Sequence, residues 1–183
     1  MSTLEIDMTD STQNRILRVT RWLVYLIMGL VAFVGVVLAG VSVILPFYWN
    51  EAVKELLTSN PGMNVTELMP LLLAVFALGI VVLGLIWTIM RKLLAIIASV
   101  EIGNPFVHAN ALRLKAIGWM MVMLQLVGIP LAMLAGKAAD IFGESDTGLD
   151  ISLNGILAIL LVFVLAGIFE RGAEMREELE GTV

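Results

Sequence analysis

The sequence predicts an all-α integral membrane protein, a four-helix bundle in which helices 2, 3 and 4 extend into the cytoplasm. Four stretches, residues 22–47, 68–90, 117–134 and 151–169, contain no Asp, Glu, Lys, Arg or His. A helix rises about 1.5 Å per residue and needs about 20 apolar residues to cross about 30 Å of hydrocarbon. The composition agrees, since 60% of the residues are hydrophobic, 15% are charged and the mean hydropathy is +0.98. We therefore expect a single membrane domain over residues 1–183.

The basic residues are concentrated in the two tails and the middle connector, although the formal net charge is −5. These segments contain Arg15, Arg18, Arg21, Arg91, Lys92, Arg113, Lys115, Arg171 and Arg176. The other two connectors contain only Lys54 and Lys137. Because cytoplasmic segments of membrane proteins carry an excess of Lys and Arg, we expect both termini and the middle connector to be cytoplasmic.

The first span has aromatic residues at its ends and small residues inside it. The aromatic residues are Trp22, Tyr25, Tyr48 and Trp49, a placement typical of the two membrane surfaces. The small residues are Gly29, Ala32, Gly35, Ala39 and Gly40. Small residues let helices approach closely in lipid. We therefore expect this face to pack against another helix, with Gly35 and Ala39 at the contact, and it also offers a surface for a homodimer.

The second span is the most apolar and the third is the least. Pro70 suits the first turn of a helix, so the second helix should begin near Leu68. In the third span Pro130 should kink the helix, and Gln125 should face neighbouring helices because its amide finds no water in lipid. Asn154 of the fourth span is a candidate hydrogen-bond partner for Gln125. A buried Gln beside a kink would also suit a substrate path, so a small oligomeric transporter or channel is the alternative function.

Two helices are predicted to continue past the membrane as a short cytoplasmic stalk. Residues 91–100 contain no helix breaker, and Leu93, Ile97 and Val100 repeat at helical spacing. A second stripe runs through the charged segment at the C-terminus: Ile168, Gly172, Met175 and Leu179. Both patterns indicate helix that continues beyond the hydrocarbon.

Residues 101–118 contain signals for a helix stop and restart. Gly103 can adopt a left-handed cap after the stalk. Asn104 can cap the next helix through its side-chain oxygen, and Pro105 suits the first position of that helix. We therefore expect a cytoplasmic helix to begin here and to grow into the third span.

The same segment and the C-terminus carry a recognisable motif. Its residues are Gly103, Pro105, Phe106, Asn110, Leu112, Ile117 and Gly118, together with the ending 169–183. At these positions the chain resembles the domain of unknown function 2975 family, which consists of bacterial four-span membrane proteins. The family often has an acidic residue where this chain has Ala109. The resemblance implies a multi-pass protein of the bacterial cytoplasmic membrane.

Members of that family are often encoded beside small Cro-type helix-turn-helix repressors. The resemblance therefore implies a non-enzymatic membrane protein that binds and sequesters a cytoplasmic helix-turn-helix transcription factor. The cytoplasmic residues that could form the docking surface are Phe106, Asn110, Arg113, Glu174, Met175 and Arg176. Acidic residues from Glu174 to Glu180 could mask a basic recognition helix. In the alternative interpretation, these residues simply cap and pair the helices.

The sequence predicts no enzymatic activity, no cofactor and no metal site. The chain contains no Cys, which excludes disulfides and thiolate chemistry. His108 is the single His and has Glu101 as its nearest carboxylate in the sequence, whereas a metal site needs several converging ligands. Ser42 and Thr88 have no His partner for nucleophilic catalysis. The negative net charge argues against direct binding of nucleic acid, so lipid and protein are the expected partners.

Overall fold

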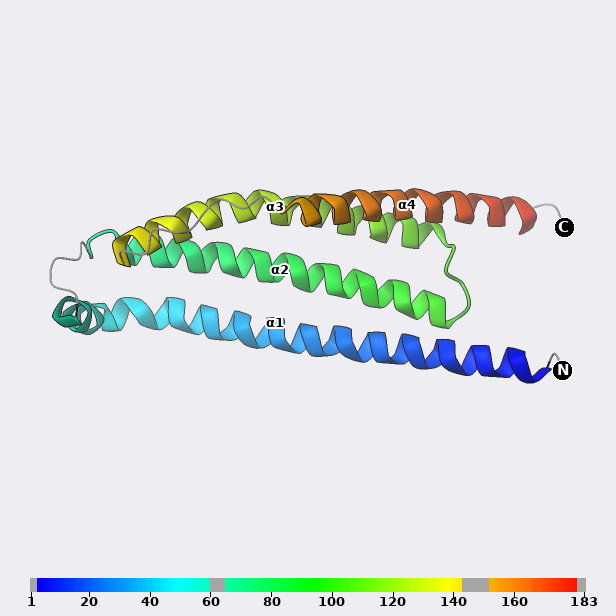
Figure 1. Cartoon of the computed structure of the whole chain (residues 1–183), viewed down its shortest axis with the longest axis horizontal. Coiled ribbons are helices and arrows are strands. Elements are labelled where there is room, and N and C mark those ends of the chain that lie inside the picture. The colour runs from blue at the N-terminus through cyan, green and yellow to red at the C-terminus, as the bar shows by residue number, and fades with distance from the viewer. Residues whose placement is uncertain (1–2, 60–64, 143–151, 181–183) are drawn as a thin grey trace. The chain divides into compact units, whose positions relative to one another are not determined.

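The described part of the chain contains four long helices (Figure 1). The computed structural model describes residues 3–59, 65–142 and 152–180, and no strand occurs in these ranges. The helices are α1 (Thr3–Ser59), α2 (Leu68–Glu101), α3 (His108–Phe142) and α4 (Leu153–Glu180). The predicted all-α fold with four helices is thereby confirmed.

Each helix is long and apolar enough to cross a membrane. Each contains an 18-residue window of high mean hydropathy: 2.7 in α1, 2.8 in α2, 2.0 in α3 and 2.3 in α4. A helix satisfies its backbone hydrogen bonds internally, which is the condition for crossing lipid. By length and composition, the chain is a multi-pass membrane protein.

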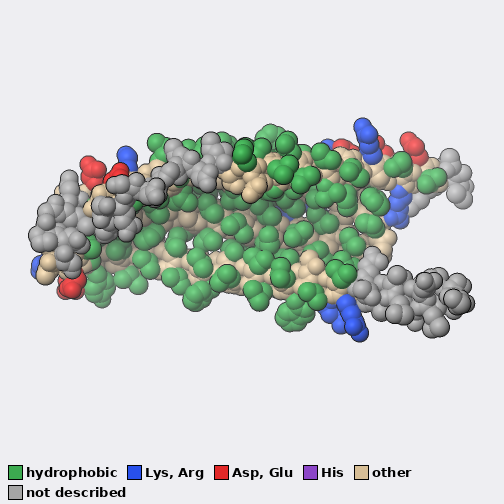
Figure 2. All heavy atoms as spheres, viewed as in Figure 1, with side chains coloured by type: hydrophobic (Ala, Val, Ile, Leu, Met, Phe, Trp, Pro, Cys, Tyr) green, Lys and Arg blue, Asp and Glu red, His purple; other side chains and the backbone are tan. Residues whose placement is uncertain are grey.

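The helix surfaces are apolar where lipid would contact them. Hydrophobic side chains cover most of the visible helix surface, and charged side chains gather toward the helix ends (Figure 2). Leu26, Leu126 and Leu161 are among the large apolar side chains that remain more than half exposed. A soluble monomer rarely exposes apolar surface on this scale, whereas lipid tails cover it without cost.

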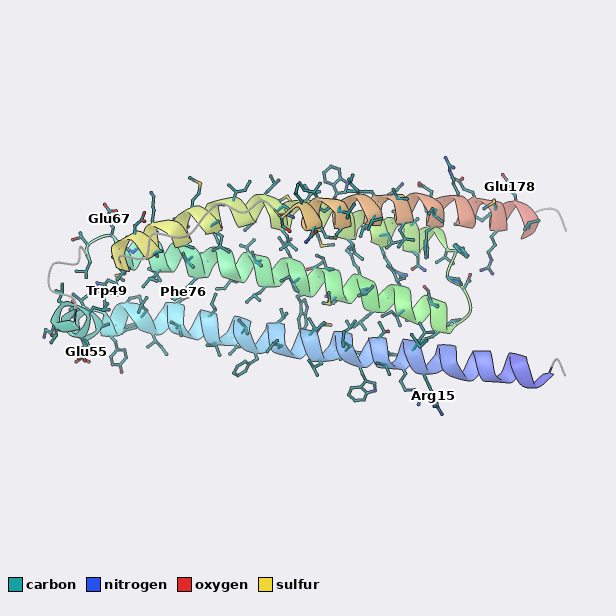
Figure 3. All side chains as sticks on the ribbon, viewed as in Figure 1. Arg15, Trp49, Glu55, Glu67, Phe76 and Glu178 are labelled. Carbon is teal, nitrogen blue, oxygen red and sulfur yellow. The ribbon has the colours of Figure 1, made fainter. Side chains whose placement is uncertain are left out.

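The helices extend beyond the uncharged stretches. As predicted, α2 continues past Met90 and α4 continues past Phe169. α1 is also longer than its span, since it begins at Thr3 and runs through Pro46 to Ser59. Pro46 has no N–H for the carbonyl one turn earlier, and such a site bends a helix. The last turns of α1, with Trp49 and Glu55, run in a different direction from the preceding part (Figure 3).

The described residues form two compact units, and unit 1 contains those of residues 1–30, 87–121 and 154–183. One core cluster consists of Ile96, Leu114, Ile117 and Ala166, and a second consists of Val24, Met28 and Ile97. Neighbouring helix positions point about 100° apart. Ile96 and Ile97 therefore let α2 pack against α3 and α4 on one side and against α1 on the other.

One end of unit 1 gathers four helix termini. The start of α1, the end of α2, the start of α3 and the end of α4 all lie at this end (Figure 1). Residues 102–107 connect α2 to α3 there. We call it the turn end.

Unit 2 contains the described residues of 31–86 and 122–153. In this unit α1 and α2 approach closely, because a Cβ placed on Gly79 would lie 2.9 Å from Leu38 Cδ2. A Cβ on Gly35 would lie 3.8 Å from Leu83 Cδ1, so this small residue of the first span does meet another helix, α2 of the same chain. Ala39 is exposed. The homodimer through the small residues of the first span stays a prediction.

Candidate functional site at the α2–α3 turn

α2 ends in a Schellman cap around Gly103. The Gly103 N–H donates to the Val100 carbonyl over 2.9 Å, and the Asn104 N–H donates to the Ser99 carbonyl over 3.0 Å. Gly103 has a φ of +79°. This left-handed conformation costs a residue with a Cβ about 1–2 kcal/mol. The predicted left-handed cap at Gly103 is confirmed.

The predicted roles of Asn104 and Pro105 at the next helix are wrong. α3 begins at His108, so Asn104 does not cap it and Pro105 is not its first residue. A residue before proline avoids the helical conformation, and the Pro105 carbonyl is occupied by the Val107 N–H at 3.1 Å. These two constraints delay the start of α3. Asn104 Oδ1 is buried and has no hydrogen-bond partner within the described part of the chain.

Asn110 is fully buried and holds the turn together. Its Nδ2 donates to Ser99 Oγ of α2 and, over 2.8 Å, to the Pro105 carbonyl. Its Oδ1 accepts a 2.7 Å hydrogen bond from Arg113 Nη1, which also donates to the Ala95 carbonyl over 3.4 Å. A buried amide is tolerated where its polar atoms are bonded in this way. Partner binding by Asn110 stays a prediction, and from this position the side chain would act by fixing the turn.

Phe106 connects the turn to α4. Its ring centroid lies 5.2 Å from that of Phe169, with the rings tilted by 45°. A Cβ placed on Gly172 would lie 2.6 Å from Phe106 Cδ1, so the ring rests directly on the α4 backbone. The side chain is still 42% exposed. Phe106 therefore has one side packed on α4 and another side accessible.

The predicted site residues of α4 come after Gly172, the residue that Phe106 contacts. Met175 is 60% exposed and Glu174 is also exposed. Arg176 is half-buried and interacts with the rest of the protein. Figure 3 shows Glu178 near the end of this helix, where it is exposed as well. The end of α4 thus presents apolar and acidic side chains beside Phe106.

Two ion pairs join the helices of unit 1. Lys115 Nζ of α3 lies 2.7 Å from Glu170 Oε1 of α4, and Arg21 Nη1 of α1 lies 2.9 Å from Glu101 Oε2 of α2. All four side chains are partly exposed, so water screens each pair and the contribution of each pair to stability is small. Their main effect is to fix the helices in register around the turn end.

Of the predicted site residues at the turn, Asn110 and Arg113 are joined by a hydrogen bond, and Phe106 contacts α4 instead. Sequence reasoning missed the partners that hold them, above all Ser99 and Phe169. Ser99 did carry a signal, because it is the single polar residue between Leu93 and Val100. The contact of Phe169 with Phe106 carried none, because the two residues are distant in sequence.

The two polar residues predicted inside the membrane lie in different units. Gln125 is half-buried within α3 in unit 2, and Asn154 is exposed near the start of α4 in unit 1. The hydrogen bond between them stays a prediction.

Among the residues that the structure describes, no group of three or more His, Cys, Asp or Glu side chains could hold a metal ion. What the turn end does present is a rigid, hydrogen-bonded connection with exposed apolar and charged side chains around it.

Comparison with known proteins gives one match. Residues 95–183 match the model of a family described as "Protein of unknown function (DUF2975)". No curated protein and no solved structure matches the chain. The matched segment contains the cap, the turn and the whole of α3 and α4. Residues 95–183 are therefore similar to the DUF2975 family, which agrees with the resemblance seen in the residues of the turn and the C-terminus.

Proposed function

We propose that this protein is a non-enzymatic regulator of the bacterial cytoplasmic membrane that binds and sequesters a cytoplasmic helix-turn-helix transcription factor. The observation that carries the proposal is a set of large apolar side chains that stay exposed near the turn end, outside the uncharged stretches of the helices. These side chains are Ile102, Phe106, Leu112, Met175 and Leu179. We call these five residues the docking surface.

Lipid does not account for the exposure of the docking surface. Every one of its residues lies outside the stretches 68–90, 117–134 and 151–169, in segments that contain several charged residues. Charged residues are costly within the hydrocarbon, so these segments belong outside it. Large apolar side chains that remain exposed outside the hydrocarbon are typical of a protein-binding surface.

The charges around the docking surface favour a basic partner. Glu174, Glu177 and Glu178 are exposed on the last turns of α4. A helix-turn-helix protein reads DNA with a basic surface that neutralises phosphates. Acidic side chains that complement that surface would steer the partner toward the membrane and compete with DNA for it.

Orientation also favours a cytoplasmic partner. The excess of Lys and Arg in the tails and the middle connector supports a cytoplasmic turn end, because cytoplasmic segments of membrane proteins are enriched in these residues. A DNA-binding protein would be available there.

The test uses the full chain in lipid nanodiscs and a small Cro-type helix-turn-helix repressor bound to its operator DNA. We expect the chain to bind this protein and to release it from its operator DNA. Fluorescence anisotropy of the labelled DNA measures the release. Met175→Asp and Glu178→Lys should each weaken the release about tenfold or more, because they alter an apolar contact and an opposing charge.

The matched control is Glu51→Lys, an exposed acidic residue of α1 in unit 2. It makes the same charge change away from the docking surface and should leave the release unchanged. The proposal fails if the DNA-binding protein does not bind the full chain. It also fails if the two docking-surface variants release the DNA as well as the control does.

A further inference from the structure

Unit 1 contains a cavity that the docking surface does not use. Its volume is about 530 Å³. The residues that line it are Arg18, Arg21, Trp22 and Tyr25 of α1 and Glu101, the last residue of α2. Two guanidinium groups, two aromatic rings and one carboxylate thus surround a space large enough for a small polar group.

The two arginines differ in their interactions with neighbouring side chains. Arg21 pairs with Glu101, and its guanidinium carbon lies 5.9 Å from the centroid of the Tyr25 ring. Arg18 lies one turn earlier on α1 and is exposed. No carboxylate among the described side chains forms an ion pair with Arg18. The described lining residues therefore carry a net positive charge of one. Among the described side chains, Glu101 orients the Arg21 guanidinium, and the Arg18 guanidinium has no ion-pair partner.

The position of the cavity along α1 indicates where its ligand resides. The uncharged stretch 22–47 begins directly after Arg21. Trp22 is 72% exposed and Tyr25 is 48% exposed, and such rings settle at the level of lipid headgroups. A spacing of four residues from Arg18 to Trp22 puts both on the same face of the helix. Basic and aromatic side chains thus meet at the depth where lipid phosphates lie.

We propose that this cavity binds the phosphate group of an anionic phospholipid. The Arg18 and Arg21 guanidinium groups donate hydrogen bonds to the phosphate oxygens, a pairing for which the planar guanidinium is well suited. Trp22 and Tyr25 contact the glycerol and the first methylenes of the acyl chains. Glu101 orients Arg21 but also repels the phosphate, so the free charge of Arg18 supplies the attraction.

The test is lipid binding by the full chain in detergent micelles, counted by native mass spectrometry. The probes are a short-chain phosphatidylglycerol, a phosphatidylcholine of the same chain length, glycerol phosphate and inorganic phosphate. We expect one phosphatidylglycerol to bind about tenfold more tightly than the phosphatidylcholine, because the lining is positive. Equal binding of these two lipids would overturn the preference for an anionic headgroup. Equally tight binding of inorganic phosphate would overturn the assignment to a lipid.

Three variants locate the site. Arg18→Gln removes the free guanidinium and should weaken phosphatidylglycerol binding about tenfold. Arg91→Gln removes an exposed arginine of α2 that does not line the cavity. It should change phosphatidylglycerol binding less than about twofold, because salt screens the attraction between distant charges. Glu101→Gln removes the opposing charge and should tighten binding about threefold or more.

Arg18 is exposed, so its loss is not expected to unfold the protein, and an unchanged thermal transition verifies this. The proposal is overturned if Arg18→Gln and Arg91→Gln bind phosphatidylglycerol equally well, or if Glu101→Gln weakens the binding. None of these outcomes involves the DNA-binding partner.

Discussion

The Phe106 ring lies against the backbone of α4 at Gly172, where an added Cβ would come within 2.6 Å of Phe106 Cδ1 and 3.2 Å of Cγ. Cγ is next to the Phe106 backbone, so the ring cannot make room without moving the turn. The contact joins the α2–α3 connection to the last helix through a residue that has no side chain. It therefore determines both the stability of the turn and the exposure of Phe106 on the docking surface.

Gly172→Ala should destabilise the protein by about 1–3 kcal/mol through overpacking. The measurement is thermal unfolding in detergent. In a Phe106→Ala background the ring is absent, so the same substitution should cost much less. Equal costs of Gly172→Ala in the two backgrounds would contradict the contact. Gly167→Ala is the control, since a Cβ there meets nothing within 4 Å.

Asn110→Ala should cost about 2–4 kcal/mol, because it removes the three hydrogen bonds that the buried amide makes with Ser99 Oγ, the Pro105 carbonyl and Arg113 Nη1. Hydrogen exchange should rise at the turn amides, beginning with Gly103 and Val107. His108→Ala changes an exposed neighbour and should cost less than about 0.5 kcal/mol. A small effect at Asn110, similar to that at His108, would show that the amide does not hold the turn.

The sequence predicted those features that depend on local chemistry. Hydropathy identified the four helices, since a run without charges has few alternatives to crossing lipid. Gly103 was identified because the left-handed cap of a helix favours glycine so strongly. The continuation of α2 past Met90 followed from the absence of any helix breaker.

The features that the sequence did not predict depend on contacts between distant residues or on local backbone preferences that oppose one another. The order Asn104-Pro105 resembles a helix start, but the restriction before proline and the use of the Pro105 carbonyl move the start to His108. The burial of Asn110 depends on Ser99 and Pro105, which only the folded turn brings to its amide. Phe106 lies in the connection between α2 and α3 and Gly172 lies in α4, so no periodicity connects them.

Gly118→Ala tests the packing of α3 on α4 in unit 1. A Cβ there would lie 2.9 Å from Phe163 Cζ, and the same ring meets Trp119 edge-on with a centroid separation of 5.9 Å. The end of a Phe ring can shift more easily than its base, so we expect a smaller cost than at Gly172, about 1 kcal/mol. Thermal unfolding in detergent measures it. A stabilised variant would mean that the two helices have room to separate.

Orientation in the membrane can be tested directly because the chain has no cysteine. Single-cysteine variants at Ala109 and Met175, both exposed in unit 1, should react with a membrane-impermeant maleimide only after the cells are made permeable. Variants at Glu55 and Glu67, both exposed in unit 2, should react in intact cells. This pattern follows from the excess of basic residues in the tails and the middle connector. The reverse pattern would place the docking surface outside the cell, where no DNA-binding protein could reach it, and would exclude the proposed function while leaving the fold and the lipid site untouched.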